Sequence, residues 1–66
     1  MIALRPGKTA KALGISRTTL YRWTINGVIP DRAVRQWGKH QLRYDAEELA
    51  LAGFRLNGIE LPKTNP

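Results

Sequence analysis

The chain has 66 residues, enough for one small domain, with 11 Lys and Arg against five Asp and Glu, a formal charge of +6. It has no cysteine and one histidine, His40, which excludes a disulfide framework and a thiolate-bound zinc site, so we expect no metal and no cofactor. No apolar run reaches the roughly 20 residues of a membrane span, and the first residues lack the apolar stretch of a secretory signal, so we expect a cytoplasmic protein.

The charge is unevenly distributed along the chain. Residues 1–43 hold nine bases and one acid, whereas residues 44–66 hold two bases and four acids. A positive field attracts polyanions, of which nucleic acid is the commonest. The basic part is therefore expected to face the partner, the alternative being a charge that serves only solubility.

Two short helices are predicted in the first half of the chain. Pro6 suits the first turn of a helix, and the helix formers after it predict a helix over 6–13. Gly14 can adopt the left-handed conformation that ends a helix, and Ser16 is a good N-cap for a second helix over 17–25. Two helices joined by a short turn that contains glycine form a helix-turn-helix pattern.

The periodicity of these helices separates a buried side from an exposed side. Ala10 allows the two helices to approach closely, and the shared core is expected from Leu13, Ile15, Leu20 and Trp23. The other side of the second helix carries Thr18, Tyr21, Arg22 and Ile25, and no acid occurs in this helix. We expect that side to contact the partner. The alternative is a plain amphipathic helix with Tyr21 and Ile25 covered by neighbours.

A small β-hairpin is predicted after the second helix. Val28 and Ile29 are expected to cover the core, and Pro30 prevents the helix from continuing. The β-compatible runs AVRQW and QLRY flank a loop of about three residues that contains glycine.

A third helix is predicted over 46–52. Asp45 is its expected N-cap, two glutamates in the first turn complement the helix dipole, and Gly53 is expected to end it. Leu49 is its best core candidate.

Residues 53–66 are expected to form a C-terminal hairpin or a flexible tail beside a domain of residues 1–52. The Asn57-Gly58 pair fits a two-residue turn. Such a turn would pair Leu56 with Ile59, Phe54 with Leu61, and Arg55 with Glu60. Because an isolated hairpin is barely stable, it would have to pack on the domain or on a partner.

The segment TAKALGISRTTLYRWTINGVIP carries a family pattern. It resembles the small winged helix-turn-helix proteins of the excisionase and MerR-like group, and the hairpin and RYDAEEL resemble the wing of that group and the helix after it. The resemblance covers about residues 3–52. It implies a fold that is mainly α with a small β-hairpin, a winged helix-turn-helix DNA-binding domain.

The resemblance also implies which residues contact double-stranded DNA. The second helix would enter the major groove, with contacts from Ser16, Arg17, Thr18, Thr19, Tyr21 and Arg22. Ser16 would bind a phosphate, while Arg17 and Arg22 can contact guanine or clamp phosphates. Contacts from the wing and to the backbone are expected from Lys8, Arg32, Arg35, Lys39, His40 and Arg43.

The function implied is that of a phage or mobile-element excisionase, which binds and bends attachment-site DNA cooperatively and directs integrase toward excision. Further copies of the protein on adjacent sites, and integrase through residues 53–66, are the expected protein partners. A small Cro-like or MerR-like transcriptional regulator is the alternative, although the long dimerisation helix and effector site of MerR regulators are missing.

Two other classes of protein are alternatives to a DNA-binding protein. An enzyme is not expected, because the chain offers no nucleophile–base pair and no phosphate-binding glycine loop. A protein-only adaptor that binds an acidic partner is the remaining alternative.

Overall fold

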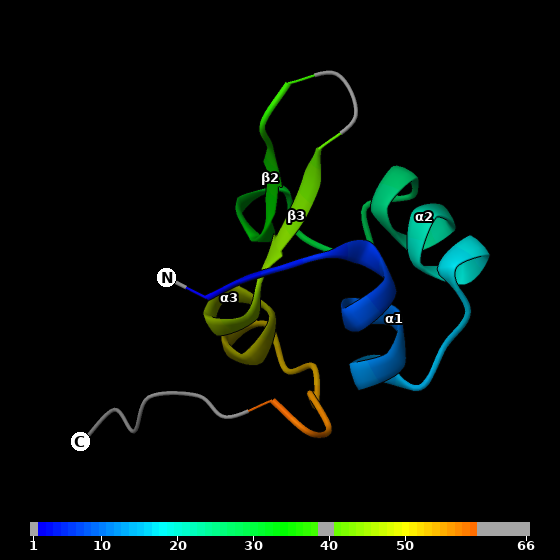
Figure 1. The fold of residues 1–66 in the computed structure, drawn as a ribbon, viewed down its shortest axis with the longest axis vertical. Helices are drawn as coiled ribbons and strands as arrows, with labels where there is room; N and C mark the ends of the chain where they lie inside the picture. The colour runs from blue at the N-terminus through cyan, green and yellow to red at the C-terminus, as the bar shows by residue number, and fades with distance from the viewer. Residues whose placement is uncertain (1, 39–40, 60–66) are drawn as a thin grey trace.

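The structure is a computed structural model that describes residues 2–38 and 41–59. Within these residues it has three α-helices and a three-stranded antiparallel sheet, so the fold is mixed α/β (Figure 1). The elements are β1 (Ala3–Leu4), α1 (Pro6–Leu13), α2 (Arg17–Ile25), the 3-10 helix η1 (Asp31–Ala33), β2 (Val34–Gln36), β3 (Leu42–Asp45) and α3 (Ala46–Leu51).

Local signals determine α1 and α2, and both have the predicted bounds. Pro6 opens α1, and Gly14 follows its last residue with a left-handed φ of 73°. The backbone N–H of Gly14 donates to the carbonyl of Lys11 at 3.2 Å. Ser16 then caps α2, its Oγ accepting from the backbone N–H of Thr19 at 3.1 Å.

The sheet is larger than the predicted hairpin, because β1 adds a third strand. The strand order is β1-β3-β2, which places β3 in the middle. Leu4 lies opposite Tyr44, and Val34 lies opposite Tyr44 from the other side. The N-terminal segment is therefore held against the strand that leads into α3, and the backbone N–H of Ala46 donates to the carbonyl of Ile2 at 2.9 Å.

The core lies where the helices meet the sheet. Its buried members are Ala10, Leu20, Ile29, Ala33, Tyr44 and Leu49, and partly buried side chains packed around them include Leu13, Ile15 and Trp23. The predicted helix core is thus confirmed.

Val28 is the exception among the expected core residues. It is 51% exposed, while its neighbour Ile29 is fully buried. The backbone N–H of Ile29 donates to the carbonyl of Trp23 at 3.2 Å, which fixes the turn after α2. Only Ile29 then faces the core, and the prediction for Val28 was wrong.

A partly buried pair of hydroxyl groups joins α2 to the sheet. The Thr24 hydroxyl donates to the carbonyl of Leu20 at 2.8 Å, so its oxygen accepts the phenol proton of Tyr44, also at 2.8 Å. Burial raises the pKa of the Tyr44 phenol above its ordinary value of 10.0. The Thr24 hydroxyl, which can rotate to donate to the phenolate, opposes part of that shift.

Asp45 caps α3 as predicted. Its Oδ1 accepts from the backbone N–H groups of Glu47 at 3.0 Å and Glu48 at 3.3 Å. The helix ends at Leu51, one residue before the predicted bound, and Gly53 follows with a positive φ of 96°. The N–H of Gly53 donates to the carbonyl of Ala50 at 3.0 Å, which closes the helix end.

The segment after α3 packs back onto the domain. The Phe54 and Trp23 ring centroids are 6.2 Å apart, and Leu56 packs against the core. The backbone N–H of Asn57 donates to the carbonyl of Ala12 at 2.9 Å. Residues 53–59 contain no strand. The predicted pairs with Glu60 and Leu61 lie outside the described residues.

Candidate nucleic-acid interface

The exposed side of α2 is the one that the helical periodicity predicted. Leu20 is buried and Trp23 is partly buried, whereas the other side is open to solvent. The exposed side chains are Arg17, Thr18, Tyr21, Arg22 and Ile25. Because α2 has two arginines and no acid, this side can approach a polyanion without charge repulsion.

Ser16 and Thr19 serve the start of α2 instead of extending from its exposed side. The Ser16 oxygen accepts the Thr19 N–H, and its hydroxyl donates to Oγ1 of Thr19 at 3.0 Å. The single hydroxyl proton of Ser16 is therefore engaged within the cap. The Thr19 hydroxyl only accepts in this cap, so its own proton can still be donated to a DNA contact.

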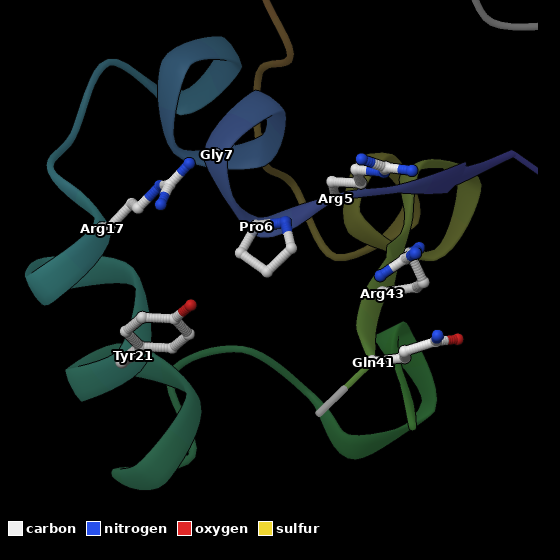
Figure 2. A pocket seen from close by; sticks show the side chains of 7 residues that line it. All are labelled: Arg5, Pro6, Gly7, Arg17, Tyr21, Gln41 and Arg43. Atoms are coloured by element: carbon white, nitrogen blue, oxygen red, sulfur yellow. The ribbon is translucent and has the colours of Figure 1, made fainter. Parts of the chain in front are cut away.

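A cleft of about 420 Å³ opens beside α2 (Figure 2). Arg17 and Tyr21 line it from α2, and Pro6 and Gly7 line it from the start of α1. The opposite wall is formed by Arg5, Gln41 and Arg43. Among the described residues that line the cleft, three are arginines and none is acidic.

The sheet explains why Arg5 and Arg43 share one wall. Leu4 pairs with Tyr44 in antiparallel register, so the next residue on each strand, Arg5 and Arg43, lie beside one another (Figure 2). Nη1 of Arg43 donates to the carbonyl of Leu42 at 2.9 Å, and its guanidinium lies 5.9 Å from the Trp37 ring centroid. These contacts hold the Arg43 side chain in place.

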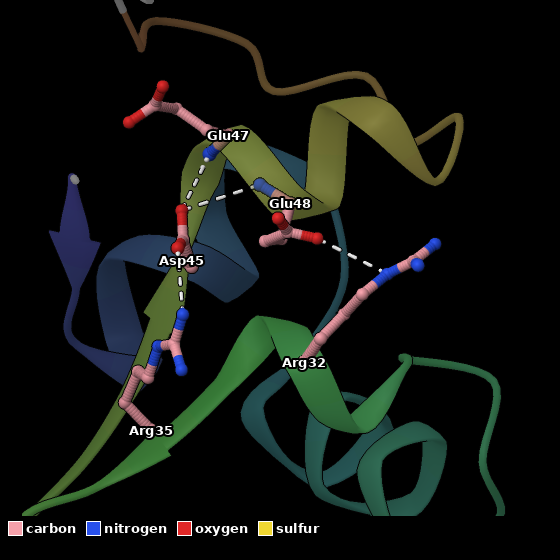
Figure 3. Close-up of polar contacts among 5 residues, drawn as sticks. All are labelled: Arg32, Arg35, Asp45, Glu47 and Glu48. Carbon is pink, nitrogen blue, oxygen red and sulfur yellow. Dashed lines mark hydrogen bonds and ion pairs between the residues drawn. The ribbon is translucent and has the colours of Figure 1, made fainter.

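Arg32 and Arg35, expected to neutralise phosphates, each form an ion pair with an acid of the next segment (Figure 3). Nε of Arg32 lies 3.2 Å from Oε2 of Glu48, and Nη2 of Arg35 lies 3.5 Å from Oδ2 of Asp45. Asp45 thus holds Arg35 with one oxygen and caps α3 with the other. The positive charge of each arginine is partly offset by its acidic partner, and neither arginine lines the cleft.

The remaining predicted residues fall into two groups. Lys8 is exposed on α1 and lines, with Lys11 and Asn57, a second hollow of about 260 Å³. Lys39 and His40 lie outside the described residues.

Arg5, Gly7 and Gln41 line the cleft but were missed as site residues. The signal that would have found Arg5 is the alternation of Ile2 and Leu4 with smaller or polar neighbours, which is typical of a short strand. Gly7 and Gln41 carry no comparable signal.

No group of three or more His, Cys, Asp or Glu side chains is placed to hold a metal ion within residues 2–38 and 41–59. In the same part of the chain, no helix is both long and apolar enough to cross a membrane.

Comparison with known proteins found no match among family models, curated proteins or solved structures.

Proposed function

We propose that the protein binds double-stranded DNA sequence-specifically as a winged helix-turn-helix domain. The observation that carries the proposal is the acid-free exposed side of α2, which continues into the cleft with three arginines. In this proposal α2 is the recognition helix in the major groove, and the hairpin of β2 and β3 is the wing.

The exposed residues of α2 divide between base reading and backbone contact. Arg22 can donate two hydrogen bonds to guanine, and Thr18 can bond a base edge or touch a thymine methyl group. The basic residues around them neutralise phosphates. Apart from Arg55 in the segment after α3, six bases form no ion pair with an acid within residues 2–38 and 41–59: Arg5, Lys8, Lys11, Arg17, Arg22 and Arg43.

The test is a duplex-binding assay over a range of salt concentrations. If about six phosphates are neutralised, the logarithm of affinity falls with the logarithm of salt at a slope of about −5. A protein-only adaptor would bind no duplex at low salt, and that result would overturn the proposal.

The biological output we propose is that of an excisionase, on the strength of the sequence resemblance. One domain that reads a single groove has a small footprint, so we expect several copies to bind adjacent sites and bend the DNA. Footprinting on DNA that flanks the protein's own gene distinguishes an excisionase from a transcriptional regulator. Direct repeats beside an attachment site support an excisionase, whereas a palindromic operator at a promoter supports a transcriptional regulator.

A further inference from the structure

The cleft beside α2 has the charge and shape to accept a length of DNA backbone. We propose that it binds one strand of the sugar–phosphate backbone of duplex DNA, with Arg17 and Arg5 contacting two different phosphates of that strand from opposite walls. This inference rests on the proposed DNA-binding function and specifies where one strand lies.

The arrangement of the arginines favours an extended anion over a single ion. Arg17 lies on the α2 wall, while Arg5 and Arg43 lie together on the other wall, with Pro6 between the walls (Figure 2). Because the cationic groups do not converge on one point, a chain of phosphates can satisfy both walls at once.

The position of the cleft relative to α2 supports the same ligand. A helix in the major groove, which is about 12 Å wide, has a backbone strand on each side. The cleft borders α2 directly, through Arg17 and Tyr21. When the exposed side of α2 faces the bases, one of the two DNA strands that border the groove would therefore lie in the cleft.

The lining supplies the hydrogen-bond donors that phosphates require. A guanidinium can donate two parallel hydrogen bonds to one phosphate, and the Tyr21 hydroxyl and the Gln41 amide add neutral donors. Arg17 then fixes the position of the protein on the duplex without reading sequence, and base reading falls to Thr18 and Arg22.

The first experiment measures the salt dependence of binding to a 20-base-pair duplex of random sequence. Arg17→Gln and Arg5→Gln should each reduce the slope of log affinity against log salt by about 1 unit. Each should weaken binding to this random duplex and to a duplex selected from a random pool by the same factor. Arg55→Gln is the matched control, because Arg55 is exposed in the segment after α3 and does not line the cleft. Thermal unfolding of each variant verifies that it is folded.

The second experiment locates the phosphates on a duplex recovered by selection from a random pool. Single methylphosphonates, which remove one backbone charge, are placed in turn along each strand. At the phosphate that Arg17 contacts, a methylphosphonate should weaken binding of the wild type, and Arg17→Gln should then cause no further loss of affinity. Arg5→Gln should show the same behaviour at a different position on the same strand. No such position, or positions on opposite strands, would overturn the arrangement.

The outcomes separate this inference from the proposed function. If the wild-type chain binds no duplex, DNA binding itself fails. If it binds and Arg22→Gln weakens it, but both cleft variants behave like Arg55→Gln, only the cleft assignment fails. Inorganic phosphate alone should leave the amide resonances of Gly7 and Gln41 unchanged at phosphate concentrations where the duplex shifts them. Equal shifts would overturn the backbone assignment in favour of a single-ion site.

Discussion

The guanidinium of Arg17 lies against Gly7, at the point where α1 begins. A methyl group at Gly7 would be 2.6 Å from Nη2 of Arg17 and 3.1 Å from Nε. Gly7 is not among the glycines with positive φ, so this position requires space and not an unusual backbone conformation. The absent side chain lets Arg17 lie along the edge of the cleft.

Gly7→Ala should therefore change stability and binding in opposite directions. Alanine favours the helix over glycine by up to about 1 kcal/mol, so urea unfolding should show a more stable domain. The displaced guanidinium should lower duplex affinity several-fold, measured by fluorescence anisotropy. In an Arg17→Gln background, Gly7→Ala should leave duplex affinity unchanged. If Gly7→Ala lowers affinity there as much as in the wild type, the contact between Gly7 and Arg17 is irrelevant to binding.

Arg22→Ala should weaken the selected duplex by about 1–3 kcal/mol and random duplex much less. The reason is that Arg22 extends from the exposed side of α2 and does not line the cleft. Competition between selected and random duplexes measures the ratio. Equal losses on both would make Arg22 a phosphate contact.

Ending the chain after Ala52 should destabilise the fold, because it removes three contacts. These are the Phe54 ring on Trp23, the packing of Leu56 on the core, and the Asn57 N–H bond to Ala12. We expect a loss of about 2–4 kcal/mol, which is large for so small a domain. Thermal unfolding of chains ended after Ala52 and after Ile59 provides the comparison.

The chain ended after Ile59 is also the better test of contacts between copies or with integrase. It keeps the packed segment, so a loss of cooperative binding on adjacent sites would not be due to unfolding. Undiminished cooperativity would remove residues 60–66 from that role.

Tyr44→Phe should cost about 1 kcal/mol at pH 7, through loss of the hydrogen bond to Thr24. It should also change the alkaline limit of stability. Because the pKa of Tyr44 is raised in the folded state, its stabilising effect is fully present below pH 10 and is lost as the pH rises through the folded-state pKa. Urea midpoints above pH 10 should fall less steeply for the variant than for the wild type, and parallel falls would contradict this.

Glu48→Gln should increase the affinity for random duplex a few-fold at low salt, since it frees Arg32 from its ion pair. The same substitution combined with Arg32→Gln should produce a smaller increase, from the change in net charge alone. If Glu48→Gln increases affinity equally in the wild type and in the Arg32→Gln variant, the ion pair does not restrain Arg32.

The sequence predicted the elements whose boundaries are set locally. Pro6, Gly14 and Ser16 each act within one turn of the helix that they start or end, so α1 and α2 have the expected bounds. The strand β1 was missed because it has two residues and its partner β3 is distant in the sequence. The alternation of Ile2 and Leu4 is typical of a short strand, but no local pattern reveals which strand it pairs with.

The same distinction applies to the candidate site. The exposed side of α2 follows from helical periodicity and was predicted. The pairing of Arg32 and Arg35 with Glu48 and Asp45 depends on how η1 and β2 pack beside α3, so counting charges along the chain could not show it. The position of Arg5 depends in the same way on the β1–β3 register.

The pairing of β1 with β3 has a consequence for how the domain assembles. Among the strands of the described residues, β1 comes first in the sequence and pairs with β3, which comes last. The sheet therefore closes a loop that contains α1 and α2, and this slow step follows the fast local contacts between the helices. Arg5 reaches its wall of the cleft only when that loop closes. A helix-turn-helix fragment without β3 would keep the exposed side of α2 but lack one wall of the cleft, and a nascent chain would gain that wall only after β3 pairs with β1.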